Sequence, residues 1–470
     1  MSTKKLLAAM LLVLAMIATA CNDSEEDDAD VTVDEDAAEV AEDEPAEGGE
    51  AEGGGEPVGE DVSGEISILH AFTGEDDVAG LTTIIDAFKE QYPNITVNEE
   101  GAGGFESLAR TRINSGQAPD IILHPQPGLL EGFVNQGVVQ PVDYLDEGLG
   151  DELVGGLLDL STFDGTNYGV PMRLSFKSLV WYNQPVFDEA GYEIPEPWDE
   201  LMALTEQIAA DGEYAPWCIG IESEDATGWV ATDWVEDILL RAIGPDAYDQ
   251  WVAGELDFAS EEVQGAIEEY MVPIWTNDEY VNGGRENITR EAFGTAVNGI
   301  LGGTEGECVL HRQATFIEGF ITEAAPDAEF GTDYNFFYLP PIDEEIGKPA
   351  LGAGDIAARY SDTEASQAFM EFLASPEAGE GWAELGGYLS PFTTFDESVY
   401  PTDSTREAAA LLGETDFFRF DGSDVMPGDV GSSSQEGSFW LEMTEWASGG
   451  QELEQALTNI DELYADVADN

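Results

Sequence analysis

Segments with the patterns of β-strands and α-helices alternate through the region that follows residue 64. Apolar and polar residues alternate in Glu65–Phe72, and apolar residues recur at helical spacing in Val78–Tyr92. The same two patterns then predict a strand, a helix and a strand at Ile95–Val97, Phe105–Ser115 and Pro119–His124. Strands that alternate with helices of this length predict an α/β fold with a mostly parallel sheet flanked by helices.

Ligands of such open sheets bind beyond the carboxyl ends of the strands. The first predicted strand ends at His70 and Phe72, and the third ends at His124 and Gln126. These four residues are therefore candidates for ligand contacts. For His70, a buried histidine with a satisfied hydrogen bond is an equally open alternative.

The first 21 residues have the pattern of a bacterial lipoprotein signal. Two lysines precede an apolar run over residues 6–17, which is shorter than the about 20 residues of a membrane-spanning helix. The sequence Ala-Thr-Ala-Cys follows, and it resembles a lipobox. Residues 1–20 are therefore expected to be removed and Cys21 to carry the lipid, with an ordinary signal peptide cleaved near Ala20 as the alternative.

Residues 21–64 are expected to form a disordered acidic tether between that anchor and a folded body. The segment consists mainly of Asp, Glu, Ala and Gly and has no Lys, Arg or aromatic residue, so it cannot bury enough apolar surface to fold. The whole chain has 99 acidic and 15 basic residues, a formal net charge of -84. This charge argues against nucleic-acid binding and resembles the surfaces of proteins from salt-adapted organisms.

Two cysteines, Cys218 and Cys308, remain once Cys21 is assigned to lipid. In an exported protein they are expected to form a disulfide, and two buried free thiols are the alternative. The sequence has three histidines, none at a metal-ligand spacing with these cysteines. It also has no phosphate-binding glycine loop and no nucleophile elbow, so neither a metal, a cofactor nor a catalytic residue is expected.

Three motifs in the middle of the chain carry a resemblance to a known family. The sequences YGVPMR and KSLVWYN, at residues 168–173 and 177–183, are followed by PWDEL at residues 197–201. This order resembles the extracellular solute-binding proteins of carbohydrate type, which are the capture subunits of ABC importers. The stretch FDGSDVMPGDVGSSSQEGSFW, at residues 420–440, is most similar to the α-glucoside-binding branch.

The resemblance implies a two-lobed periplasmic-binding-protein-like fold, in which each lobe is a mostly parallel sheet flanked by helices and a hinge closes the lobes on a ligand. Residues 65–173 and about 338–357 would form lobe 1, and residues about 174–337 and about 358–470 would form lobe 2. The implied function is to capture a neutral oligosaccharide, an α-glucoside in particular, and deliver it to an ABC permease without chemistry. Such a protein would be a monomer outside the cytoplasmic membrane, to whose outer face the lipid anchors it.

Two tryptophans are the strongest candidates for stacking against a sugar ring. Trp229 lies in a polar, turn-like setting, and Trp440 follows the Gly/Ser-rich residues 431–438. A tryptophan face packs on the apolar face of a pyranose while polar neighbours bond its hydroxyl groups. The family resemblance places an aromatic platform at a position such as that of Trp440.

Arg173, Asp233 and Asp355 are polar candidates for the same site. The guanidinium of Arg173 can bond two sugar hydroxyl groups, or it can form a structural pair with a carboxylate. Asp233 and Asp355 lie in polar turns and can accept hydrogen bonds from hydroxyl groups. Each of them can equally be a surface charge in a chain this acidic.

A lipid-anchored glycoside hydrolase is the alternative function. Its mechanism would need two carboxylates about 5–10 Å apart, and sequence alone does not identify such a pair. The resemblance to binding proteins favours the binding function.

Overall fold

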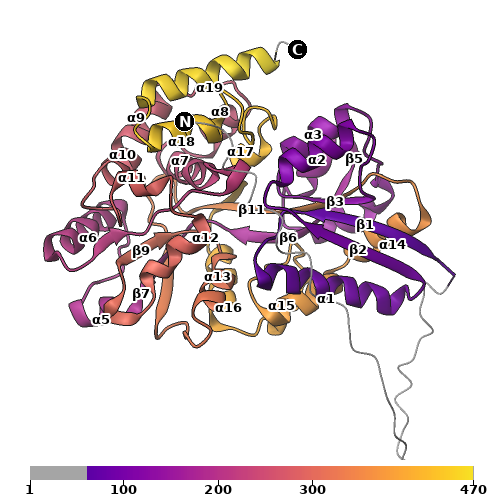
Figure 1. The fold of residues 1–470 in the computed structure, drawn as a ribbon, viewed down its shortest axis with the longest axis horizontal. Helices are drawn as coiled ribbons and strands as arrows, with labels where there is room; N and C mark the ends of the chain where they lie inside the picture. The colour runs from indigo at the N-terminus through magenta and orange to yellow at the C-terminus, as the bar shows by residue number, and fades with distance from the viewer. Residues whose placement is uncertain (1–60, 469–470) are drawn as a thin grey trace, which may run out of the picture. The chain divides into compact units, whose positions relative to one another are not determined.

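The computed structural model describes residues 61–468, and the predicted signal, Cys21 and all but the last few residues of the tether lie outside this range. Strand β1 (Gly64–His70) pairs in parallel with β2 (Ile95–Gly101) and with β3 (Ile121–His124). Helices α1 (Glu75–Gln91) and α2 (Phe105–Asn114) connect these strands. The expected alternation of strands and helices is therefore confirmed, and with it the α/β fold class (Figure 1).

Later segments complete this first sheet, whose path runs β12-β11-β3-β1-β2 with β6 also paired to β11. Strand β11 (Pro349–Arg359) is antiparallel to β3 and to β6 (Gly169–Phe176), and parallel to β12 (Phe417–Phe420). The sheet therefore joins strands from both ends of the described chain. It cannot form from the first hundred residues alone.

Helices cover both faces of the first sheet because alternate residues of β1 point to opposite sides. Ile66 and Ile68 belong to a core cluster that includes the apolar face of α1, while Leu69 packs with residues of α2 and α3 (Pro127–Asn135). Figure 1 shows α1 on one side of these strands and α2 and α3 on the other.

The second sheet has the order β10-β7-β9-β8. Strand β7 (Leu179–Asn183) is antiparallel to both β9 (Cys308–Arg312) and β10 (Tyr334–Tyr338), and only β8 (Ala215–Trp217) and β9 are parallel. The expectation of a mostly parallel sheet in each lobe is wrong here. The two residues between β6 and β7 carry the chain from the first sheet to the second.

The assignment of chain segments to two lobes stays a prediction, but contacts refine one part of it. Helix α14 (Glu364–Leu373) packs on β1 and β11, and α15 (Glu380–Leu385) packs on α1. Residues 364–385 thus lie on the first sheet, whereas α18 (Phe439–Ala447) and α19 (Leu453–Ala468) pack on each other, and α18 also packs on α7 (Trp229–Ala242).

The structure joins Cys218 to Cys308, with their Cα atoms 5.6 Å apart. Cys218 directly follows β8 and Cys308 begins β9, the parallel neighbour of β8. Gly299 faces the pair so closely that a Cβ atom there would lie 2.4 Å from the Cys308 Sγ. The disulfide therefore sits in the packed interior of the second sheet, where only a residue without a side chain fits beside it.

Within residues 61–468, no helix combines the length and the apolar character that crossing a membrane requires.

Candidate functional site

A pocket of about 1000 Å³ is partly open to solvent. Its lining includes residues that follow strands of the first sheet and residues of helices α7 and α18. Phe72 follows β1 and Gln126 follows β3, as expected for a site beyond strand ends. Trp229 begins α7, and Trp440 lies in the first turn of α18. The aromatic lining of the pocket consists of Phe72, Phe105, Trp229, Phe293, Phe316, Phe320 and Trp440.

The strand pair β6 and β11 positions Arg173 at this pocket. The Arg173 Nε donates to Asp355 Oδ2 over 2.9 Å, and its Nη1 donates to Asp77 Oδ1 over 2.7 Å. The guanidinium also lies 4.8 Å from the ring centre of Phe72 and 4.7 Å from that of Trp382. The pairing of Arg173 with carboxylates is therefore real, and it holds Arg173 and Asp355 together in the lining.

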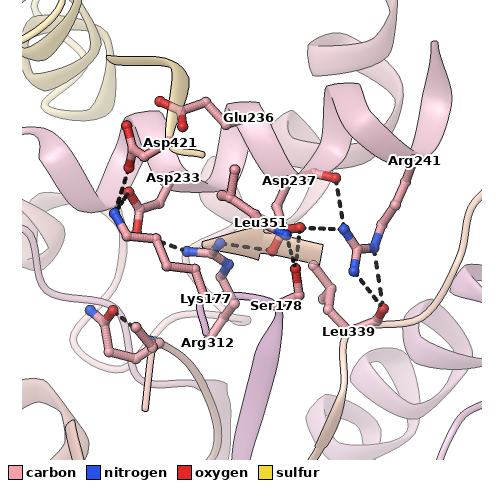
Figure 2. A network of polar contacts seen from close by, with 12 residues as sticks. Lys177, Ser178, Asp233, Glu236, Asp237, Arg241, Arg312, Leu339, Leu351 and Asp421 are labelled. Carbon is pink, nitrogen blue, oxygen red and sulfur yellow. Dashed lines mark hydrogen bonds and ion pairs between the residues drawn. The ribbon is translucent and has the colours of Figure 1, made fainter. Parts of the chain in front are cut away.

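Lys177, in the short link between β6 and β7, is the second cation of the pocket. Its Nζ donates to Asp233 Oδ1 over 2.8 Å and also to Asp421, and it lies 5.3 Å from the ring centre of Trp229 (Figure 2). The sequence pattern did not mark Lys177 as a binding candidate. Its position at the point where the chain crosses between sheets makes it part of the lining.

Asp233 does not line the pocket, because it lies behind Lys177 on the buried face of α7. Its carboxylate is fully buried and also accepts from Arg312 Nη1 over 3.3 Å. Burial raises the pKa of Asp233 to about 7, and Lys177 and Arg312 act against this rise. Figure 2 shows this buried group of acids and bases continuing from Lys177 through Arg312 to Asp237 and Arg241.

Three carboxylates of this group, those of Asp233, Glu236 and Asp421, lie within 4.8 Å of one another, a spacing that could hold a metal ion. The Lys177 ammonium already bonds Asp233 and Asp421. The Glu236 carboxylate accepts from the backbone nitrogens of Gly422 and Ser423, at 2.8 and 3.1 Å. These carboxylate charges are thus met by groups of the protein itself.

Neither predicted histidine reaches the pocket lining. His70 is buried, with its Nε2 2.8 Å from Glu99 Oε2 and its Nδ1 accepting from the Phe72 nitrogen. His124 is buried too, with its Nε2 2.8 Å from the Tyr360 hydroxyl group. Both histidines are still part of their strands, β1 and β3, and their side chains are packed in the interior. The pocket lining begins only with the residues that follow each strand.

His124 makes the stability of the protein depend on pH. Burial lowers its pKa to about 3, so as the pH falls below the unfolded value of about 6.5 the unfolded chain binds the proton first. This contribution to stability is complete above pH 6.5 and is lost on acidification towards pH 3. Relative to His124→Gln, the wild-type free energy of unfolding should fall by about 1.4 kcal/mol per pH unit below pH 6. Urea unfolding of both proteins from pH 8 to 4 measures the difference, and parallel pH profiles would contradict the prediction.

Sequence reasoning missed two groups of lining residues. Phe293, Phe316 and Phe320 pack edge to face on one another, and Phe293 and Phe316 also pack on Trp229. They come from short helices and turns without a regular period, so no pattern marks them. Glu106, Asp421 and Asp424 also line the pocket, and the close spacing of Asp421 and Asp424 within FDGSD was the available signal for those two.

The predicted Trp440 is 2% exposed, and its Nε1 donates to Ser423 Oγ over 3.3 Å. That bond ties the indole to helix α17 (Gly422–Val425), which Asp421 caps by accepting from the Asp424 nitrogen. The structure therefore brings together six of the nine predicted ligand contacts, namely Phe72, Gln126, Arg173, Trp229, Asp355 and Trp440.

A pocket in an α/β fold, lined by aromatic faces and hydrogen-bonding side chains from elements far apart in the chain, defines a small-molecule binding protein. The chain belongs to the bacterial extracellular solute-binding protein family, whose model matches residues 73–380. Its relatives are likewise described as binding proteins, not as enzymes.

Two relatives match over most of their length. The osmoprotective compounds-binding protein GgtB of Synechocystis is 38% identical over 86% of this chain and 94% of its own. The alpha-glucosides-binding periplasmic protein AglE of Rhizobium meliloti is 37% identical over 83% of this chain and 85% of its own. The solved structure of the solute receptor AcbH, 17% identical, covers 86% of this chain and all of its own with a TM-score of 0.73. That likeness confirms the fold.

Proposed function

We propose that the protein captures a neutral oligosaccharide, an α-glucoside in particular, and delivers it to the permease of an ABC importer. The observation that carries this proposal is the pocket, in which Trp229, Trp440 and phenylalanine rings lie beside Arg173, Lys177 and several carboxylates. A pyranose presents an apolar face to aromatic rings and a rim of hydroxyl groups to polar side chains. The name of AglE supports the choice of α-glucosides.

Closure of two lobes on the sugar belongs to the same proposal, with the crossings between the sheets acting as the hinge. The protein works as a monomer and performs no chemistry on its ligand. Lipid on Cys21, which lies outside the described residues, anchors it to the outer face of the cytoplasmic membrane, and its acidic surface suits a salt-rich medium.

Titration of residues 22–470 at high salt with maltose, sucrose, trehalose and longer α-glucosides tests the proposal. We expect a saturable change in tryptophan fluorescence in the micromolar range, because Trp229 and Trp440 line the pocket. Analysis of the same samples for glucose should find none released. If the folded protein responds to none of these sugars, the proposed ligand class is wrong, and release of glucose would support the hydrolase instead.

A further inference from the structure

Two buried oxygen atoms in the pocket lining have no hydrogen-bond partner. They are Oε2 of Glu106 and Oε1 of Gln126, in side chains 8% and 4% exposed. The Gln126 Nε2 donates to Glu106 Oε1 over 2.9 Å, so the amide's donor side is in use and its acceptor side remains free. A buried acceptor without a partner destabilises the ligand-free protein, and a ligand with matching donors would remove that cost.

A third acceptor, Asp424, comes from the other side of the pocket. Its helix α17 packs directly on α3, which begins one residue after Gln126. Helix α3 and the end of α17 lie so close together that a Cβ atom on Gly128 would be 1.8 Å from the Met426 carbonyl oxygen. This packing fixes Asp424 beside Gln126 and Glu106. Burial is the first cause of the raised pKa of Asp424, and charge repulsion from Asp421, Asp233 and, least of these, Glu106 adds to it.

The cations nearby form their ion pairs with other carboxylates, although the charge of Arg110 still acts against the rise in the pKa of Glu106 that burial causes. The Lys177 Nζ bonds Asp233 and Asp421, and Arg110 Nη1 pairs with Asp429 over 3.1 Å. Within residues 61–468, no base forms an ion pair with Glu106 or Asp424. This end of the pocket therefore offers hydrogen-bond acceptors, and neither Lys177 nor Arg110 forms an ion pair with them.

We propose that Glu106, Gln126 and Asp424 form a subsite that recognises adjacent hydroxyl donors of a neutral ligand and sets its specificity. Two neighbouring hydroxyl groups can donate to the free oxygens of Glu106 and Gln126, and Asp424 accepts from a third donor. A sugar acid or sugar phosphate finds no ion-pair partner at these acceptors, and a sugar that lacks one of these hydroxyl groups leaves a buried oxygen unpaired. The inference rests on the proposed function and names the residues that select within it.

Calorimetric titration of residues 22–470 with the sugar that binds most tightly, and with its monodeoxy analogues, tests the subsite. Glu106→Gln keeps the shape but replaces an acceptor by a donor, so we expect a roughly 10- to 100-fold loss of affinity. Against the deoxy analogue that lacks the hydroxyl group facing Glu106, wild type and variant should differ by less than about 3-fold. The Asp424 carboxylate accepts no hydrogen bond from the described part of the chain. The Asp424→Asn variant should lose affinity for the sugar by about 5- to 10-fold.

Glu318→Gln is the matched control, because Glu318 is also an acid with a pKa raised by burial but bonds Tyr334 and Ser404 outside this pocket. It should bind within about 2-fold of the wild type. Wild-type affinity in both Glu106→Gln and Asp424→Asn, or equal losses against every deoxy analogue, would overturn the subsite and leave the proposed function intact. Failure of the wild type to bind any sugar would instead overturn the proposed function.

Discussion

Replacement of Arg312 by Met is expected to lower the free energy of unfolding by about 3–5 kcal/mol. Arg312 is 1% exposed, and its Nη2 donates to Asp237 Oδ2 over 2.7 Å while its Nη1 donates to Asp233 (Figure 2). Methionine fills much of the same volume, but it carries no positive charge to compensate the negative charges of the two fully buried aspartates. Removal of one partner from a buried ion pair exposes this cost, even where the intact pair adds little.

Urea unfolding at one fixed salt concentration, followed by tryptophan fluorescence, measures this loss. Arg290→Met is the control, because Arg290 pairs with Glu286 over 3.5 Å at a site where both side chains are exposed. That pair should contribute less than about 1 kcal/mol. A similar midpoint for both variants would show that the buried group of charges does not stabilise the fold.

Replacement of Trp229 by Ala is expected to weaken sugar binding by about 30- to 100-fold, since loss of an aromatic face costs roughly 2–3 kcal/mol. Trp229 is partly buried, and its ring lies 5.1 Å from that of Phe293 and 5.3 Å from the Lys177 Nζ. The indole therefore already has a fixed orientation in the pocket lining before a ligand binds. The substitution by alanine removes this oriented ring.

Calorimetry is the suitable measurement, because the substitution removes one of the fluorescent side chains. Trp229→Phe should keep affinity within about 5-fold, since a smaller ring still offers a face. Unfolding of each variant without sugar separates binding from stability. Equal affinity of Trp229→Ala and wild type in a folded protein would remove Trp229 from the site.

The parts of the fold that follow from local pattern could be predicted from the sequence. Helix α1 ends at Gln91, two residues before Pro93, and the strands before and after it were expected within a few residues. Strand ends also led to Phe72 and Gln126. The same reasoning failed for His70 and His124, because it does not tell the last buried residue of a strand from the first residue beyond it.

Features that depend on distant contacts could not be predicted. Asp233 faces Arg312 of β9 and not the ligand pocket, and Asp237, one helical turn further along α7, bonds the same arginine. Glu106 on α2 and Asp424 on α17 line the same pocket because Glu106 bonds Gln126 and α17 packs on α3, which begins directly after Gln126. Nothing in the local sequence distinguishes Glu106 from the many other acids of the chain.

The order of strands in the first sheet has a consequence for how the protein matures. Strand β1 begins at Gly64, yet β11 and β12, which complete its sheet, span residues 349–359 and 417–420. Because the chain is synthesised from its N-terminus onward, the earliest strands of the sheet wait for late partners. Folding of this sheet therefore finishes only after most of the chain has been made, and β1 spends that time without its complete sheet.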